Sequence, residues 1–108
     1  MIYEYRVYEA MPGKMPDLQA RFRDHTLALF EKHGIKNIGY WTPNVGDYSN
    51  RLIYILAFQS VEQREQAYAD FAADPAWQKA RAESEVGGPL VEKLTNILLN
   101  PTDYSPLQ

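Results

Sequence analysis

The chain of 108 residues contains no cysteine, which excludes disulfide bonds, thiolate catalysis and iron–sulfur ligation. Its 11 lysines and arginines form no cluster and are outnumbered by 14 acidic residues, so no surface for nucleic-acid phosphates is expected. No apolar run approaches the roughly 20 residues that a membrane span requires. Met1 leads directly into strand-like sequence without a basic or apolar leader, so the cytoplasm is the expected compartment.

Recognisable cofactor and metal motifs are also missing. The two histidines, His25 and His33, stand eight residues apart with no carboxylate at a ligand spacing, so no metal site is expected. The sequence has no Gly-rich phosphate loop and no flavin or nicotinamide fingerprint. We therefore expect a protein without a cofactor.

The composition is that of one globular domain covering residues 1–108. Hydrophobic residues make up 45% and charged residues 23%, which suffices for a single core. Eight of the aromatic residues are tyrosines, against four phenylalanines and two tryptophans. Tyrosine favours half-wet places such as interfaces and pocket walls, because its ring is buried while its hydroxyl seeks a partner.

The hydrophobic periodicity changes along the chain between the strand and helix types. Alternation predicts a first strand, and the helical stripe that follows ends at Gly34, a suitable residue just past a helix. Ser60 and Gln63 form a capping box, and Asp74-Pro75 should break the second helix and restart it. The predicted elements are strands at 2–10, 35–43, 51–59 and 90–99, helices at about 16–33 and from 61 to about 86, and a hairpin loop at 44–50.

This order predicts an α+β, ferredoxin-like β-α-β-β-α-β fold with a four-stranded antiparallel sheet and both helices on one face. Residues 52–58 are apolar without alternation, which indicates burial on both faces of the sheet. Two helices cover only one face, so the other needs a partner. The simplest partner is a second copy of the chain, and we expect a homodimer.

Several short motifs together resemble the NIPSNAP family, which belongs to the dimeric α/β-barrel group. The resemblance covers nearly the whole chain and depends on the order and spacing of its parts. The motifs are Tyr3-Glu4-x-Arg6-x-Tyr8, Pro12-Gly13-Lys14, His25-Thr26-Leu27, Lys32-His33-Gly34-Ile35, Gly39-Tyr40-Trp41-Thr42, Asp74-Pro75-x-Trp77 and Pro101-Thr102-x-x-Ser105-Pro106-Leu107.

The resemblance implies a dimeric α/β barrel but no particular reaction. The family has no agreed biochemical activity, and its animal members are associated with mitochondria and vesicle traffic. Related barrels include haem-degrading and quinone-forming monooxygenases that bind a ligand between sheet and helices. That wider relation is one of fold, and a shared fold does not transfer a function.

His25 is the first candidate site residue. Its spacing from Phe22 and Leu29 places it on the stripe of the first helix that should face the sheet. An imidazole near neutral pH is able to serve as an acid, a base or a ligand. The alternative is a histidine hydrogen-bonded to a neighbour and packed over the sheet edge.

Arg6 and three aromatic residues are candidates for binding a ligand. Arg6 shares a strand face with Glu4, so it either pairs with that carboxylate or holds an anionic ligand. Tyr40 and Trp41 should point to opposite faces of the sheet, and Tyr54 lies on the next strand. Core packing explains these aromatics equally well, and Trp77 is expected to be a core residue.

Two classes of function remain open. In the first, a pocket between sheet and helices binds a small apolar or aromatic molecule, and the protein is a cofactor-free oxygenase or isomerase if His25 reaches that pocket beside a second polar group. In the second, the protein is a non-catalytic protein-interaction module whose interior is filled. The space around His25 distinguishes them.

Overall fold

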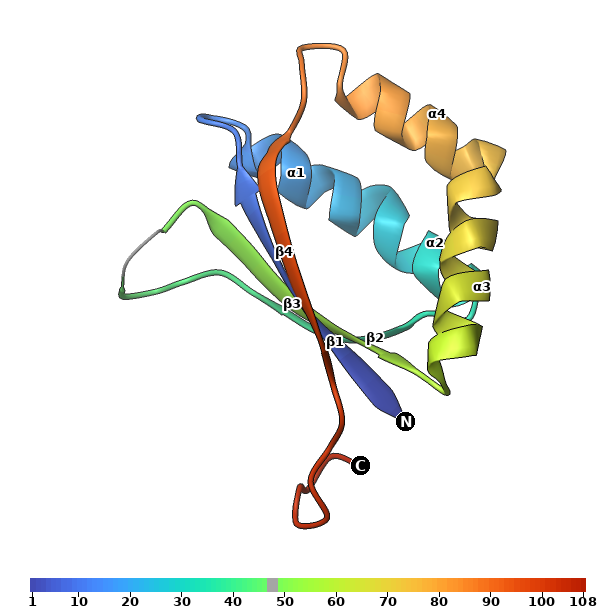
Figure 1. Cartoon of the computed structure of the whole chain (residues 1–108). Coiled ribbons are helices and arrows are strands. Elements are labelled where there is room, and N and C mark those ends of the chain that lie inside the picture. The colour runs from blue at the N-terminus through green and yellow to red at the C-terminus, as the bar shows by residue number, and fades with distance from the viewer. Residues whose placement is uncertain (47–48) are drawn as a thin grey trace.

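The computed structural model describes residues 1–46 and 49–108, and it has the predicted order of elements (Figure 1). Residues 47 and 48, in the middle of the predicted hairpin loop, lie outside the described residues. The elements are β1 (Ile2–Ala10), α1 (Met15–Arg21), the π-helical turn η1 (Phe22–Thr26), α2 (Leu27–Lys32), β2 (Lys36–Trp41), β3 (Arg51–Phe58), α3 (Val61–Ala73), α4 (Pro75–Ser84) and β4 (Val91–Leu99). None of the described helices is long and apolar enough to cross a membrane.

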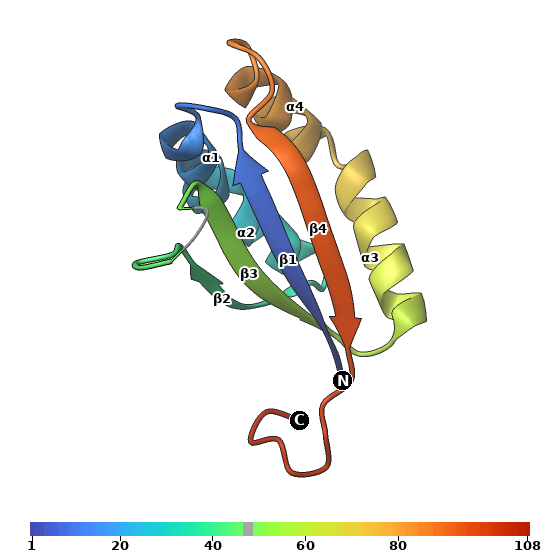
Figure 2. The same ribbon diagram turned by 60° about the vertical axis from the view of Figure 1, so that its left-hand side comes forward.

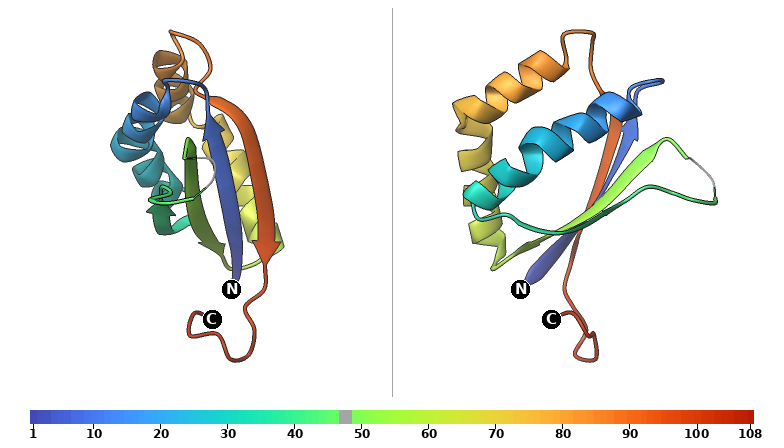
Figure 3. Two further views of the ribbon diagram at one scale, coloured as in Figure 1. Left: turned by 90° about the vertical axis from the view of Figure 1, so that its left-hand side faces the viewer. Right: turned by 180° about the vertical axis from the view of Figure 1, so that it is seen from behind.

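The four strands form one antiparallel sheet in the order β2-β3-β1-β4. All helices lie on the same side of this sheet (Figures 2 and 3). The ferredoxin-like fold predicted from the sequence is therefore confirmed. In β1 the residues Glu4, Arg6 and Tyr8 face the helices, opposite Leu56, Tyr54 and Leu52 of β3.

The core lies between the sheet and the helices, as the hydrophobic pattern predicted. Its largest enclosed side chain is Tyr54, which is completely buried. The other buried members come from both helical segments and from β3, and they are Ala10, Leu18, Phe22, Phe30, Ile35, Leu52, Leu56, Phe58, Ala67, Phe71 and Leu90.

The segment between α1 and α2 departs from α-helical geometry. In η1 the N–H of Leu27 donates to the carbonyl of Phe22, and the Thr26 hydroxyl donates to the carbonyl of Arg21 at 3.2 Å. In an α-helix a step of four residues overshoots one turn by about 40°. The wider π turn offsets that drift and keeps one row of side chains against the sheet. The buried residues of this row are Leu18, Phe22, Thr26 and Phe30.

The second helix breaks at Asp74, as the presence of Pro75 in the sequence predicted. α3 ends at Ala73, and α4 begins at Pro75 with Asp74 as its N-cap. The Asp74 carboxylate accepts hydrogen bonds from the Ala76 N–H at 2.8 Å and from Lys32 Nζ at 2.8 Å, and it lies 2.7 Å from His33 Nε2. One carboxylate thus joins the end of α2 to the start of α4.

The face of the sheet away from the helices carries no helix (Figure 3), and most of the side chains that point to it are apolar. The prediction of such a face is confirmed. Ile97 and Trp41 are each 51% exposed. We call this surface the outer face. Its apolar and aromatic members are Tyr3, Tyr5, Val7, Trp41, Ile53, Ile55, Ala57, Ile97 and Leu99, and the register adds the polar residues Lys36 and Thr95. Tyr3, Val7 and Ala57 are buried already in the single chain.

A pair of cap substitutions tests the junction at Asp74. Ser60→Ala removes the cap of α3, a hydrogen bond of 3.1 Å to the Gln63 N–H, which should cost about 1 kcal/mol. Asp74→Ala removes a cap and also the contacts with Lys32 and His33. Thermal denaturation followed by circular dichroism should show the larger loss of Tm for Asp74→Ala. Equal losses would mean that the link to α2 contributes nothing.

Candidate functional site

A cavity of about 290 Å³ lies between the sheet and the helices and is partly open to solvent. Arg6 and Tyr8 of β1 contribute one wall, and α1, η1, α2, α3 and α4 contribute the rest. Six of the ten lining residues are aromatic. The lining consists of Arg6, Tyr8, Arg21, Phe22, Thr26, Phe30, Tyr68, Phe71, Ala72 and Trp77.

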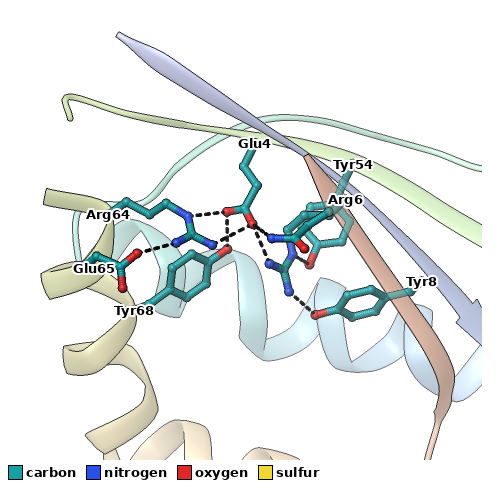
Figure 4. Close-up of polar contacts among 8 residues, drawn as sticks. Glu4, Arg6, Tyr8, Tyr54, Arg64, Glu65 and Tyr68 are labelled. Atoms are coloured by element: carbon teal, nitrogen blue, oxygen red, sulfur yellow. Dashed lines mark hydrogen bonds and ion pairs between the residues drawn. The ribbon is translucent and has the colours of Figure 1, made fainter. Parts of the chain in front are cut away.

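Glu4 is the centre of a hydrogen-bond network beside this cavity (Figure 4). The side chain is fully buried, and its two oxygens accept five hydrogen bonds. Arg64 donates two, at 3.0 and 2.9 Å, and Arg6 donates one at 2.9 Å. Tyr68 and Asn96 donate the others, at 3.0 and 2.8 Å. The network joins β1, α3 and β4, and the predicted pairing of Arg6 with Glu4 is confirmed.

The network keeps Glu4 ionised. Burial on its own would raise the pKa of this carboxyl, because the charged form loses its hydration. Hydrogen bonds from Arg64 and Asn96 and the charge of Arg6 outweigh burial and lower the pKa to about 2. Glu4 is therefore a poor proton acceptor at neutral pH.

Arg6 is held on all of its guanidinium nitrogens. Besides its bond to Glu4, it donates from Nε to the Tyr54 hydroxyl at 2.7 Å and from Nη2 to the Tyr8 hydroxyl at 3.2 Å. The rings of Tyr8, Tyr54 and Tyr68 lie 5.5 to 5.7 Å from its central carbon, within cation–π range. Burial raises the pKa of Tyr54 and of Tyr68, so these phenols are not bases at neutral pH.

Arg21 is the second cation of the cavity wall. It is 8% exposed, and its central carbon lies 5.4 Å from the ring of Trp77. Nη1 donates to the Ser84 hydroxyl at 3.3 Å and lies 4.0 Å from a carboxylate oxygen of Glu85. Burial lowers the pKa of Arg21, and the charge of Glu85 opposes that effect.

The aromatic walls pack closely against one another. Phe71 lies 4.8 Å from Phe30 and 4.6 Å from Trp77, measured between ring centroids. Phe22 meets Tyr8 edge-on at 5.7 Å. Trp77 is only partly buried and lines the cavity, so it is a wall residue as well as a packing residue.

The prediction that His25 faces the sheet is wrong. His25 is exposed, and Thr26 takes the buried position because the π turn shifts the helical register by one residue. His25 lines a different, larger groove of about 420 Å³ on the outside of the helices. That groove is open and bordered mainly by charged side chains, among them Lys14, Asp17 and Glu83. No three acidic or histidine side chains gather as a metal site in residues 1–46 and 49–108.

The three predicted aromatic residues occupy different places. Tyr54 is buried behind Arg6, and Tyr40 stacks on it at 5.0 Å with an interplanar angle of 16°. Tyr40 also lines a small surface pocket of about 190 Å³. Trp41 lies on the outer face beside Gly39, and the predicted opposition of Tyr40 and Trp41 is confirmed. Of the predicted set, only Arg6 lines the main cavity.

Sequence reasoning missed four residues of this region. Tyr8 shares the face of Glu4 and Arg6 by simple alternation, so it had a visible signal. Arg64 precedes Tyr68 by four residues, so the two side chains lie on the same face of α3. Both donate hydrogen bonds to Glu4 from that face. Arg21 had no such signal, because a charged residue on a helix is expected in water.

Comparison with known proteins identifies a family. The NIPSNAP family model matches residues 3–106. Protein NipSnap homolog 3B of Mus musculus is 30% identical over 77 residues, which cover 71% of this chain and 30% of that protein. The chain thus spans less than a third of the mouse relative.

Solved structures show the same fold. A NIPSNAP family protein of Agrobacterium tumefaciens is 29% identical with a TM-score of 0.87, covering 99% of this chain and 98% of that one. An uncharacterized NIPSNAP domain protein of Burkholderia xenovorans is 25% identical with a TM-score of 0.84, over 98% and 99% of the two chains. A putative antibiotic biosynthesis monooxygenase of Nitrosomonas europaea, at 10% identity and a TM-score of 0.63 over 94% and 98%, shares the fold alone.

The Glu4 network should make stability depend on acid pH. The folded pKa of about 2 lies below the ordinary value of 4.5, so the stabilisation is complete above pH 4.5 and is lost as the pH falls towards 2. Glu4→Gln leaves Arg6 and Arg64 without their shared carboxylate, which should cost about 3–5 kcal/mol at pH 7.

Urea denaturation of both proteins between pH 7 and pH 3 measures this difference. The gap in unfolding free energy between wild type and Glu4→Gln should narrow as the pH falls, because the wild type approaches a protonated Glu4. A gap of constant size would show that Glu4 is not the titrating group.

Proposed function

The chain belongs to the NIPSNAP family, and we propose that it binds a small, flat apolar or aromatic molecule in the cavity between its sheet and its helices. The cavity itself carries this proposal. Its volume of about 290 Å³ stands near the lower end of the range for ligand pockets, roughly 300–1,000 Å³. That size suits a ligand of one or two rings.

The chemistry of the lining also fits a flat apolar ligand. Phe22, Phe30, Phe71 and Trp77 offer faces and edges for ring packing. The polar groups Arg6, Arg21 and Tyr8 are few and fixed, which is the usual way for a pocket to orient its ligand.

Binding is better supported than proton-transfer catalysis. The lining residues of the described cavity include neither a carboxylate nor a histidine. Glu4 is close by, but its pKa of about 2 and its five hydrogen bonds leave it unsuited to act as a base. His25 borders the outer groove, which shares Arg21 with the cavity, but His25 itself does not line the cavity, so the oxygenase or isomerase hypothesis that depends on it lacks its required geometry.

We also propose that the protein is a homodimer joined through the outer face. An apolar sheet face left in water is unfavourable, and large exposed apolar patches usually mark an interface. β4 adds to this argument, because Ile97 and Leu99, which both lie on the outer face, are 51% and 40% exposed. A second copy of the same face offers a matching apolar surface, and stable dimers of this type bury about 2,000 Å² or more.

Filling the cavity should abolish binding. Naphthalenemethanol is a suitable neutral probe, with binding measured by isothermal titration calorimetry. Ala72→Phe places a ring at the cavity wall and should weaken binding at least about tenfold, which corresponds to about 1.4 kcal/mol. Ala69→Phe is the matched control, because Ala69 is exposed on the same helix and does not line the cavity.

Two results would contradict the proposal of a ligand cavity. The first is no binding of the probe by the wild type. The second is equal affinity of the Ala72→Phe and Ala69→Phe variants, which would place the probe elsewhere on the molecule.

The proposed dimer is tested by introducing a lysine on either the outer face or the helix side of β4. Ile97→Lys lies on the outer face, opposite Tyr5, and should convert the dimer into a monomer of 12.5 kDa or into unfolded protein. Leu94→Lys lies on the helix side, opposite Tyr8, and should leave the mass of a dimer. Light scattering after size exclusion measures both. A wild-type mass of 12.5 kDa at micromolar concentration would overturn the proposal.

A further inference from the structure

Arg21 differs from the other arginine of the cavity in how it is satisfied. Arg6 donates to Glu4, Tyr8 and Tyr54 from its three nitrogens. Arg21 is anchored through Nη1 alone, to Ser84 and, at 4.0 Å, to Glu85. Its Nε is buried and has no hydrogen-bond partner among residues 1–46 and 49–108. A buried donor without an acceptor is unfavourable, because it has lost its hydrogen bond to water, so this position requires an explanation.

The unused side of Arg21 has a specific geometry. With Nη1 engaged, the N–H groups of Nε and Nη2 remain, and the part of the chain that the structure describes offers neither of them an acceptor. These two groups point the same way in the plane of the guanidinium and form a fork that matches the two oxygens of a carboxylate.

The surroundings leave the charge of Arg21 poorly neutralised. The contact with Glu85 is long, and that carboxylate accepts a hydrogen bond of 3.0 Å from Arg81 Nε. Across the cavity, Glu4 is shared by Arg6 and Arg64, and Arg64 also pairs with Glu65 at 2.7 Å, so the charges of that cluster balance. Arg21 is therefore the cation of the cavity lining whose charge is least compensated, and it favours a negatively charged ligand.

We propose that the guanidinium of Arg21 binds the carboxylate of the cavity's ligand, which makes the ligand a small aromatic or apolar monocarboxylate. This inference rests on the proposed function, and it names the class of molecule that the cavity takes. The ring of the ligand packs among Phe22, Phe71 and Trp77, which line the same cavity as Arg21.

Trp77 and Ser84 hold Arg21 ready for this role. The guanidinium lies over the Trp77 ring, and Nη1 donates to the Ser84 hydroxyl. α4 supplies both residues, so one helix fixes the orientation of the arginine from two directions. A guanidinium fixed in advance loses less conformational entropy when the carboxylate arrives.

The test compares two probes of nearly the same shape. Naphthoate and naphthalenemethanol, substituted at the same ring position, differ in charge at the group that would meet Arg21. Isothermal titration calorimetry at pH 7 should give the wild type at least about a tenfold preference for naphthoate, since a bidentate charged pair is much stronger than a neutral hydrogen bond.

Variants then assign the preference to Arg21. Arg21→Gln should lose the preference while still binding naphthalenemethanol, and Arg21→Lys should retain part of it, because lysine keeps the charge without the fork. Arg23→Gln is the matched control: it removes the same charge from an exposed arginine of η1 that does not line the cavity, and it should keep the preference. Circular dichroism confirms that each variant is folded.

The outcomes separate this inference from the proposed function. Equal affinity of the wild type for the two probes overturns the carboxylate inference and leaves the cavity as a neutral site. A preference that survives in Arg21→Gln also overturns it, because the anion is then held elsewhere. If neither probe binds the wild type, the proposed function fails and the inference fails with it.

Discussion

The buried carboxylate of Glu4 is the interaction on which the rest of the structure depends. It accepts hydrogen bonds from β1, α3 and β4, and through Arg6 it reaches Tyr54 of β3. A charge without water is tolerated only when its partners are all in place, because each missing donor leaves an unpaired charge in a dry site. The network therefore demands one arrangement of three strands and one helix. Arg6 and Tyr68, which are both hydrogen-bonded to Glu4, form a fixed polar part of the cavity wall.

Arg6 and Arg21 both line the cavity, but they differ in how their hydrogen-bond donors are satisfied. Arg6 is saturated by neighbours of its own chain, so its charge serves the fold first. Arg21 is almost as enclosed, yet the donors on one side of its guanidinium have no acceptor within the described residues. The unsatisfied donor destabilises the folded state, and a ligand carboxylate bound to Arg21 would offset this loss of stability. The contrast gives a physical basis for placing the ligand's charge at Arg21 rather than at Arg6.

Local patterns in the sequence were enough to predict the fold. Alternation placed Glu4 and Arg6 on one face, and Pro75 located the break between α3 and α4. The site was harder, because it depends on features without a local signal. The π turn at 22–26 cannot be recognised from hydrophobic spacing alone. The sequence therefore assigned the buried position to His25, whereas in the structure Thr26 is buried and His25 is exposed. Arg64 meets Glu4 across 60 residues of sequence, and only the folded chain brings that pair together.

β1 serves both proposed roles without conflict, because alternate residues point to opposite faces of a strand. Arg6 and Tyr8 line the cavity and Glu4 holds Arg6 in place, whereas Tyr3, Tyr5 and Val7 belong to the outer face. A dimer formed through the outer face would thus leave the cavity open to its ligand. It would also hold the strand that carries Glu4 and Arg6 from behind.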